Sequence, residues 1–245
     1  MRREHAVDGR RGGVAAWRIP VIVPARGAAG KTRLAVPPGV DHAELARALA
    51  LDTIEAARRA RLVAHIVVVT PDATLADALP TSVRVVSEPG NADPAPSGWG
   101  TGATAPVADG LLAAVRAGLA ACPPQAPAAV LLGDLPALRR GELDAALDAA
   151  RVVIEGSGPA MAFVSDAAGT GTVLLVGALA AELWPRFGAR SATAHARSAE
   201  RLRGAWPGLR RDVDDAQDLV EAVRLGVGEH TLRALSRAVR DGRAQ

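Results

Sequence analysis

The chain has 245 residues, a hydrophobic content of 49% and a formal net charge of only +3. This length is enough for one α/β domain with a full core, and no apolar stretch approaches the ~18 residues that a membrane span requires. Aromatic residues make up 2% of the chain and the arginines are scattered, unlike the clustered basic and aromatic surfaces of nucleic-acid-binding proteins. A lone cysteine, Cys122, excludes an intramolecular disulfide and favours a cytoplasmic protein. We therefore expect a phosphorylated small molecule as partner, and neither nucleic acid nor membrane.

Residues 1–16 carry arginines with no apolar segment after them, so we expect a charged, disordered leader rather than a secretory signal. From residue 17 to 245 we predict a single domain. Short apolar runs alternate with segments of helical period, which is typical of a parallel, helix-covered sheet. The predicted strands are Ile19–Pro24, His65–Thr70, Val83–Ser87, the run beginning at Ala128, Ala160–Ser165 and Thr172–Val176; the predicted helices are Asp41–Ala60, Ala73–Leu79, Val107–Ala121, Arg140–Ala150, one beginning at Ser191, Ala216–Leu225 and His230–Asp241.

The first predicted strand leads into a glycine-rich loop that carries Lys31 and Arg33. The loop ends like a P-loop at Gly30, but the glycine required five residues earlier is replaced by Ala25. Without that rigid cradle, we interpret Lys31 and Arg33 as a flexible clamp for a triphosphate. Two cations on a solvated loop are the alternative.

The apolar run from Ala128 ends in Gly133 and a single carboxylate, Asp134. Ligands of open parallel sheets bind outside the carboxyl ends of the strands, which is where Asp134 is expected. We interpret it as a ligand of a divalent cation on a phosphate, with Gly133 allowing close backbone approach. The alternative is an ordinary helix cap, disfavoured because three residues separate Asp134 from the helical pattern near Arg140.

The segment Glu88–Pro106 is rich in proline, glycine and alanine and has no periodicity. Nineteen such residues inside a domain indicate a functional lid or a flexible insertion. Its Trp99 either covers a bound ligand or packs the loop down.

The second half of the chain offers further candidates. The Asp166–Gly171 loop suits an anion or a plain hairpin. Ser191 is expected to cap a helix and to make its end an anion site, whereas His195 is interpreted as an exposed first-turn residue. Asp212 and Asp214 would share a face if they lay on a strand. A second carboxylate there could complete the coordination shell of the cation that Asp134 is expected to bind.

Together these segments resemble the phosphoenolpyruvate (or 2-phospho-L-lactate) guanylyltransferases of coenzyme F-420 biosynthesis. The resemblance extends from about Val21 to Leu235, and the order and spacing of its motifs make it specific. The motifs are Lys31-Thr32-Arg33-Leu34, Gly133-Asp134-Leu135-Pro136-Ala137-Leu138, Asp166 with Gly169-Thr170-Gly171-Thr172, Arg186-Phe187-Gly188 with Ser191 and His195, Trp206-Pro207-Gly208-Leu209-Arg210, and Asp212-Val213-Asp214.

The resemblance implies a nucleotidyltransferase-like, Rossmann-like α/β fold with a central mixed, mostly parallel sheet flanked by helices. It also implies attack of the acceptor's phosphate on the α-phosphorus of GTP, release of pyrophosphate, and a product handed over to the next enzyme of the pathway. The expected site comprises Asp134 and Asp212 for Mg²⁺, Lys31, Arg33 and Gly133 for the nucleotide, and Thr172, Gly188 and Ser191 for the three-carbon phospho-acid, with Asp134, Asp212, Lys31 and Arg33 as the catalytic set.

One departure concerns the nucleotide contacts, because the family's Gly-Leu-Asn is replaced by Gly110-Leu111-Leu112. The acceptor could be phosphoenolpyruvate, 2-phospholactate or 3-phosphoglycerate. A guanylyltransferase of the molybdenum cofactor is disfavoured by the small segment from Phe187 to Ser191, since a pterin needs a larger pocket. A non-catalytic nucleotide-binding partner is disfavoured by the intact Asp134 and Asp212.

Overall fold

The computed structural model of the protein describes residues 17–27, 34, 36–88, 108–156 and 158–241. The expected leader, the Lys31 and Arg33 pair and most of the Glu88–Pro106 loop with Trp99 lie outside the described residues, so those interpretations stay predictions.

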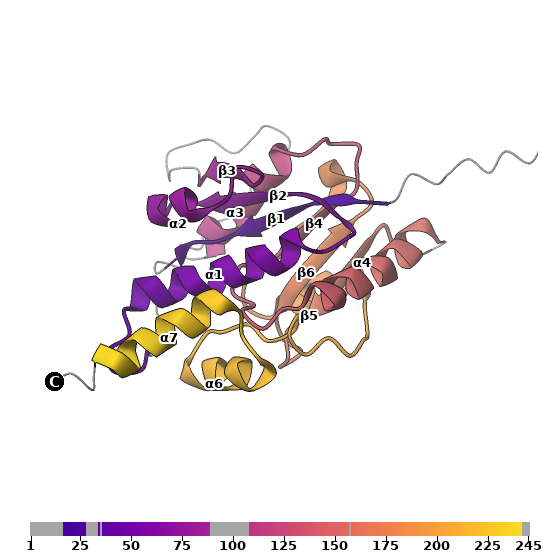
Figure 1. The fold of residues 1–245 in the computed structure, drawn as a ribbon. Coiled ribbons are helices and arrows are strands. Elements are labelled where there is room, and N and C mark those ends of the chain that lie inside the picture. Colours follow the sequence, from indigo (N-terminus) through magenta and orange to yellow (C-terminus); the bar gives the residue numbers. More distant parts are fainter. Residues whose placement is uncertain (1–16, 28–33, 35, 89–107, 157, 242–245) are drawn as a thin grey trace, which may run out of the picture.

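The described strands form one seven-stranded sheet in the order β3-β2-β1-β4-β6-β5-β7 (Figure 1). Only β6 runs against its neighbours: it is antiparallel to β4 and β5, while the other pairs are parallel. The expected mixed, mostly parallel sheet is therefore confirmed. The strands are β1 Ile19–Pro24, β2 Val63–Thr70, β3 Arg84–Ser87, β4 Ala128–Leu131, β5 Met161–Ser165, β6 Thr172–Gly177 and β7 Glu200–Arg201.

Helices cover both faces of this sheet. Alternate residues of β1 point to opposite faces, as strand geometry requires: Val21 packs in the cluster that includes α1 and α4, and Ile22 in the cluster that includes α3 and α5. The helices are α1 His42–Arg58, α2 Ala73–Ala78, α3 Ala108–Ala120, α4 Arg140–Glu155, α5 Ser191–His195, α6 Ala216–Leu225 and α7 Glu229–Asp241, with a 3-10 turn at Ala180–Glu182.

Two elements differ from the sequence expectation. α4 continues to Glu155 rather than ending near Ala150, because Val153 and Ile154 still pack against the core. The two-residue strand β7 was not predicted, since its residues are polar and exposed and it is too short to give a pattern.

The last helix is attached to α1 by a buried carboxylate. Figure 1 shows α7 lying along α1. Asp52 of α1 is 6% exposed and accepts hydrogen bonds from the amides of His230 and Thr231, at 3.0 and 2.9 Å. A Cβ on Gly228 would lie 2.3 Å from Asp52 Oδ1, so this entry to α7 requires glycine. Within the described part of the chain, no helix is both long and apolar enough to cross a membrane.

Candidate active site

The topology brings residues from several strands to one edge of the sheet. β1 to β4 are parallel, so their carboxyl ends share that edge, and the antiparallel β6 begins there with Thr172. The amide of Leu132 donates to the carbonyl of Val173 at 2.9 Å, which joins the exit of β4 to the entry of β6. Asp134, which follows β4, and Thr172, which begins the neighbouring β6, therefore lie at the same edge.

Asp134 is held in place by the residues on either side of it. A Cβ on Gly133 would lie 2.8 Å from the carbonyl oxygen of Pro24, so the close approach of β1 requires glycine here. The predicted contact of Gly133 with the nucleotide stays a prediction. On the other side, the amide of Leu135 donates to Thr53 Oγ1 at 2.9 Å, and Thr53 is fully buried in α1.

The structure brings Asp212 next to Asp134. The amide of Val213 donates to the carbonyl of Asp134 at 3.1 Å, so the segment that carries Asp212 runs beside the end of β4. This segment is not a strand, and the expectation that Asp212 and Asp214 share a strand face is not met. Burial, and then the charges of Asp134, Asp214 and Asp166, raise the pKa of Asp212 to about 7. A cation bound between Asp134 and Asp212 would relieve this repulsion.

The hairpin interpretation of the Asp166–Gly171 loop is confirmed, because the loop joins the antiparallel strands β5 and β6. The carboxylate of Asp166 itself accepts hydrogen bonds from the amides of Thr170 and Gly171, at 2.9 and 2.7 Å. These amides are thus already used within the loop that joins β5 to β6. Arg210 supports the loop from outside, donating to the carbonyls of Ser165 and Asp166 at 3.1 and 2.8 Å.

His195 is buried, not exposed as expected. It is 1% exposed at the end of α5, and the chain's two phenylalanines, Phe163 and Phe187, both pack against its ring, with centroids 5.9 and 5.4 Å away. Its Nδ1 lies 2.9 Å from Thr172 Oγ1, and its Nε2 accepts a hydrogen bond from the amide of Arg186 at 2.8 Å. Burial, and then the charge of Arg186, lower the pKa of His195 to about 4.

Ser191 is the first residue of α5 and not its N-cap. The cap is Arg190, whose backbone is left-handed (φ 58°) and whose side chain makes no capping bond. The amide of Ser191 donates to the carbonyl of Gly188 at 3.2 Å, and α5 has only five residues. The capping expectation is therefore wrong, while the predicted contact of Ser191 with the acceptor stays a prediction. Hydrogen bonds nevertheless link all three predicted acceptor-binding residues to α5. Ser191 bonds to Gly188, and Thr172 bonds to His195.

Gly188 has a φ of 130°, a conformation that favours glycine whatever space surrounds it. A valine there would be strained without any ligand, so such a variant would not report on acceptor binding.

At the same edge, Arg26 follows β1 and pairs with Glu88, which follows β3 (Nε to Oε1, 2.9 Å). The Arg26 guanidinium lies over Gly110, where a Cβ would be 2.9 Å away. Leu112, where the resemblance implies an asparagine, is partly buried against the core.

Two supporting residues were not predicted from the sequence. Thr53 lies in the predicted helix Asp41–Ala60, where a buried hydroxyl needs a polar partner. Arg210 belongs to a quoted motif but was given no role.

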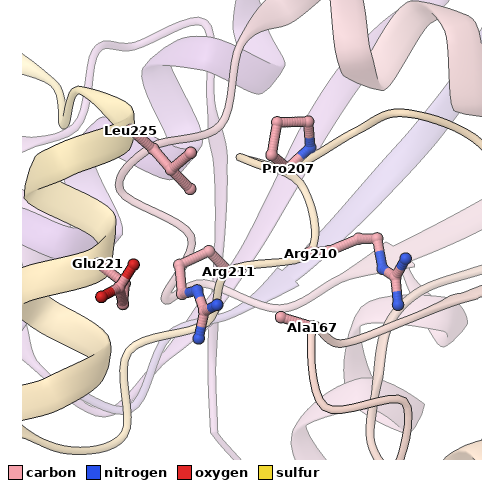
Figure 2. A pocket seen from close by; sticks show the side chains of 6 residues that line it. All are labelled: Ala167, Pro207, Arg210, Arg211, Glu221 and Leu225. Atoms are coloured by element: carbon pink, nitrogen blue, oxygen red, sulfur yellow. The ribbon is translucent and has the colours of Figure 1, made fainter.

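A pocket of about 210 Å³ is lined in part by Arg211, the residue before Asp212 (Figure 2). Arg210 is directed away from Arg211 and is used on the β5–β6 loop, while Arg211 pairs with Asp218 at 3.2 Å. Because both guanidinium groups are engaged within the protein, we assign this pocket no ligand. It is lined by Ala167, Pro207, Arg210, Arg211, Glu221 and Leu225.

Comparisons with known proteins point in one direction. The chain is 44% identical over 218 residues to the phosphoenolpyruvate guanylyltransferase of Salinispora arenicola, covering 88% of this chain and 91% of that protein. It is 43% identical over 233 residues to the protein of the same name from Mycolicibacterium smegmatis, covering 94% and 95%. A comparison with models of known families finds no match.

Among solved structures, the chain is similar to a protein described as a nucleotide-diphospho-sugar transferase from Desulfovibrio desulfuricans G20, with a TM-score of 0.54, 15% identity, and 92% and 95% of the two chains covered. The bifunctional IspDF of Campylobacter jejuni gives a TM-score of 0.50 at 12% identity, covering 83% of this chain and 54% of that one. At these identities, the likeness shows a common fold alone.

Proposed function

The chain belongs to the phosphoenolpyruvate guanylyltransferase family, and from that premise we propose that it joins GMP from GTP to phosphoenolpyruvate and releases pyrophosphate. The observation that carries this proposal is the apposition of Asp134 and Asp212 at the sheet edge where Thr172 begins β6. Two carboxylates for a metal and a buried hydroxyl for an anion are what a transfer between two phosphates requires.

We propose that Asp134 and Asp212 hold Mg²⁺. The described residues contain no group of three or more histidines, cysteines or acids placed to bind a metal. Mg²⁺ does not need one, because it is commonly bound by one or two carboxylates together with water and substrate phosphates. When bound, the ion would neutralise the charge that develops on the reacting phosphates.

The protein's remaining contribution to the reaction is to position the two substrates. A phosphate oxygen of the acceptor attacks the α-phosphorus of GTP, the bond from that phosphorus to the oxygen bridging the β-phosphate breaks, and pyrophosphate leaves with the electron pair. The attacking phosphate is already an anion, so no covalent intermediate with the protein is needed. Holding both anions in line and stabilising the developing charge account for the rate.

The roles we propose for individual residues follow this division. Lys31, Arg33 and Gly133 would bind the nucleotide; Thr172, Gly188 and Ser191 would bind the three-carbon acid. A place in coenzyme F-420 biosynthesis, a cytoplasmic location and hand-over of the product to the next enzyme belong to the same proposal.

Asp134→Asn and Asp212→Asn test it, with Asp148→Asn as the matched control because Asp148 is an exposed acid of α4. We expect both test variants to lose pyrophosphate release from GTP and phosphoenolpyruvate, and to lose the rise in melting temperature that Mg²⁺ gives the unsubstituted protein. The control should keep both properties. Near-normal turnover in either test variant would refute the shared metal.

A further inference from the structure

The hydrogen bonds around His195 fix which ring nitrogen carries its proton. The amide of Arg186 can only donate, and it points at Nε2 from 2.8 Å, so Nε2 must be unprotonated. In a neutral ring the proton then lies on Nδ1, which is 2.9 Å from Thr172 Oγ1. His195 is therefore the donor and Thr172 the acceptor in this bond.

The surroundings hold the ring in this state. His195 is 1% exposed and packs against Phe163 in a tilted contact and against Phe187 in an edge-on contact, which restrict its rotation. A second ring proton would be directed at the Arg186 amide. The lowered pKa of His195 agrees with a neutral ring at physiological pH.

A threonine hydroxyl has one proton to donate. Since Thr172 Oγ1 already accepts from His195, its own proton is left to be donated elsewhere. We propose that His195 is a positioning residue that commits the Thr172 hydroxyl to donate a hydrogen bond to the acceptor substrate. This inference rests on the proposed function, in which Thr172 binds the three-carbon phospho-acid.

The consequence is a preference among acceptors. A committed donor suits a fully ionised carboxylate or phosphate, which can only accept. A substrate that presents an amide or hydroxyl proton at the same point would leave two donors facing each other, and a buried donor without a partner is costly. The arrangement therefore selects for the anionic end of the acceptor, while the bound nucleotide is unaffected.

Two substitutions separate the roles of the two ring nitrogens of His195. In His195→Asn, the amide nitrogen takes the place of Nδ1 and can still donate to Thr172. In His195→Gln, the amide oxygen takes the place of Nε2 and can still accept from Arg186, but the donor to Thr172 is lost. We expect His195→Gln to raise the KM of phosphoenolpyruvate by roughly tenfold or more with the KM of GTP unchanged, and His195→Asn to rescue most of that loss. A merely structural histidine that holds the Arg186 segment predicts the reverse order.

Thr172→Val and the double variant with His195→Gln complete the test, because residues that act through one another are not additive. If Thr172→Val leaves the KM of phosphoenolpyruvate unchanged, the acceptor does not bind at Thr172, and both the proposed placement and this inference fail. If Thr172→Val raises that KM but His195→Gln does not, or the two effects multiply in the double variant, the inference alone is overturned. We expect the double variant to match Thr172→Val.

Discussion

Thr53→Val removes the hydroxyl that supports Asp134 while keeping the shape of the side chain. In the structure Thr53 Oγ1 donates to the carbonyl of Leu49 at 2.9 Å and accepts from the amide of Leu135 at the same distance. Both Thr53 and Leu135 are fully buried, so valine leaves the Leu135 amide without this acceptor and out of reach of water. An unsatisfied buried donor costs about 1–3 kcal/mol. For a domain of this size that corresponds to a fall in melting temperature of roughly 2–12 °C.

The same substitution should affect turnover, because Asp134 directly precedes Leu135. Loosening this turn should lower kcat for pyrophosphate release by roughly tenfold or more, since small misplacements of a catalytic group are costly. Thr53→Ser is the matched control: it loses one buried methyl group, worth about 1 kcal/mol, but keeps both hydrogen bonds and should keep kcat. The reasoning is refuted if the valine variant melts no lower than the unsubstituted protein and turns over normally, or if serine lowers kcat as much as valine.

Three further changes probe other parts of the molecule. Asp52→Ala should lower the free energy of unfolding by about 2 kcal/mol in urea titrations and speed hydrogen exchange in α7, because the helix loses its buried cap; unchanged exchange would contradict this. The pKa of His195 is lowered to about 4 in the fold, so the protein should lose stability as pH falls from about 6.5 to 4, and His195→Gln should remove about 3 kcal/mol of that loss. The pKa of Asp212 is raised, so Asp212 contributes stability that is lost as pH rises through about 7. This contribution is the same in the unsubstituted protein and in His195→Gln, so it cancels when their stabilities are subtracted. Alanine at Lys31 or Arg33 should weaken GTP binding in calorimetry, more strongly at low salt; unchanged affinity in both variants would make their loop a solvated surface.

Much of the fold could be predicted because its signals are local. The β-branched run of β1, the apolar β4 and the helical periods of α1 and α3 each depend on neighbouring residues, and the structure has them within a few positions of the predicted bounds. The end of α4 was missed since its final turn is held by packing of Val153 and Ile154, which a pattern alone does not report.

The site was predictable where a residue follows a strand, and not where its role depends on distant partners. Asp134 could be placed at the sheet edge from its position after β4. The burial of His195 could not be predicted, because it depends on contacts with Phe163 of β5 and with the Arg186 amide, which are distant in the sequence or outside its helix. Ser191 was misjudged as a cap because the left-handed turn at Arg190 starts the helix one residue earlier than serine preference suggests.

Guanylyl transfer to phosphoenolpyruvate is tested most directly by measuring pyrophosphate release with Mg²⁺ for each of the four nucleoside triphosphates against phosphoenolpyruvate, 2-phospholactate and 3-phosphoglycerate, and by identifying the product by mass. We expect the highest kcat/KM for GTP with phosphoenolpyruvate, and a product in which GMP is joined to the acceptor's phosphate. Equal turnover with the other phospho-acids, or no pyrophosphate from any pair under conditions in which the protein is folded, would contradict it.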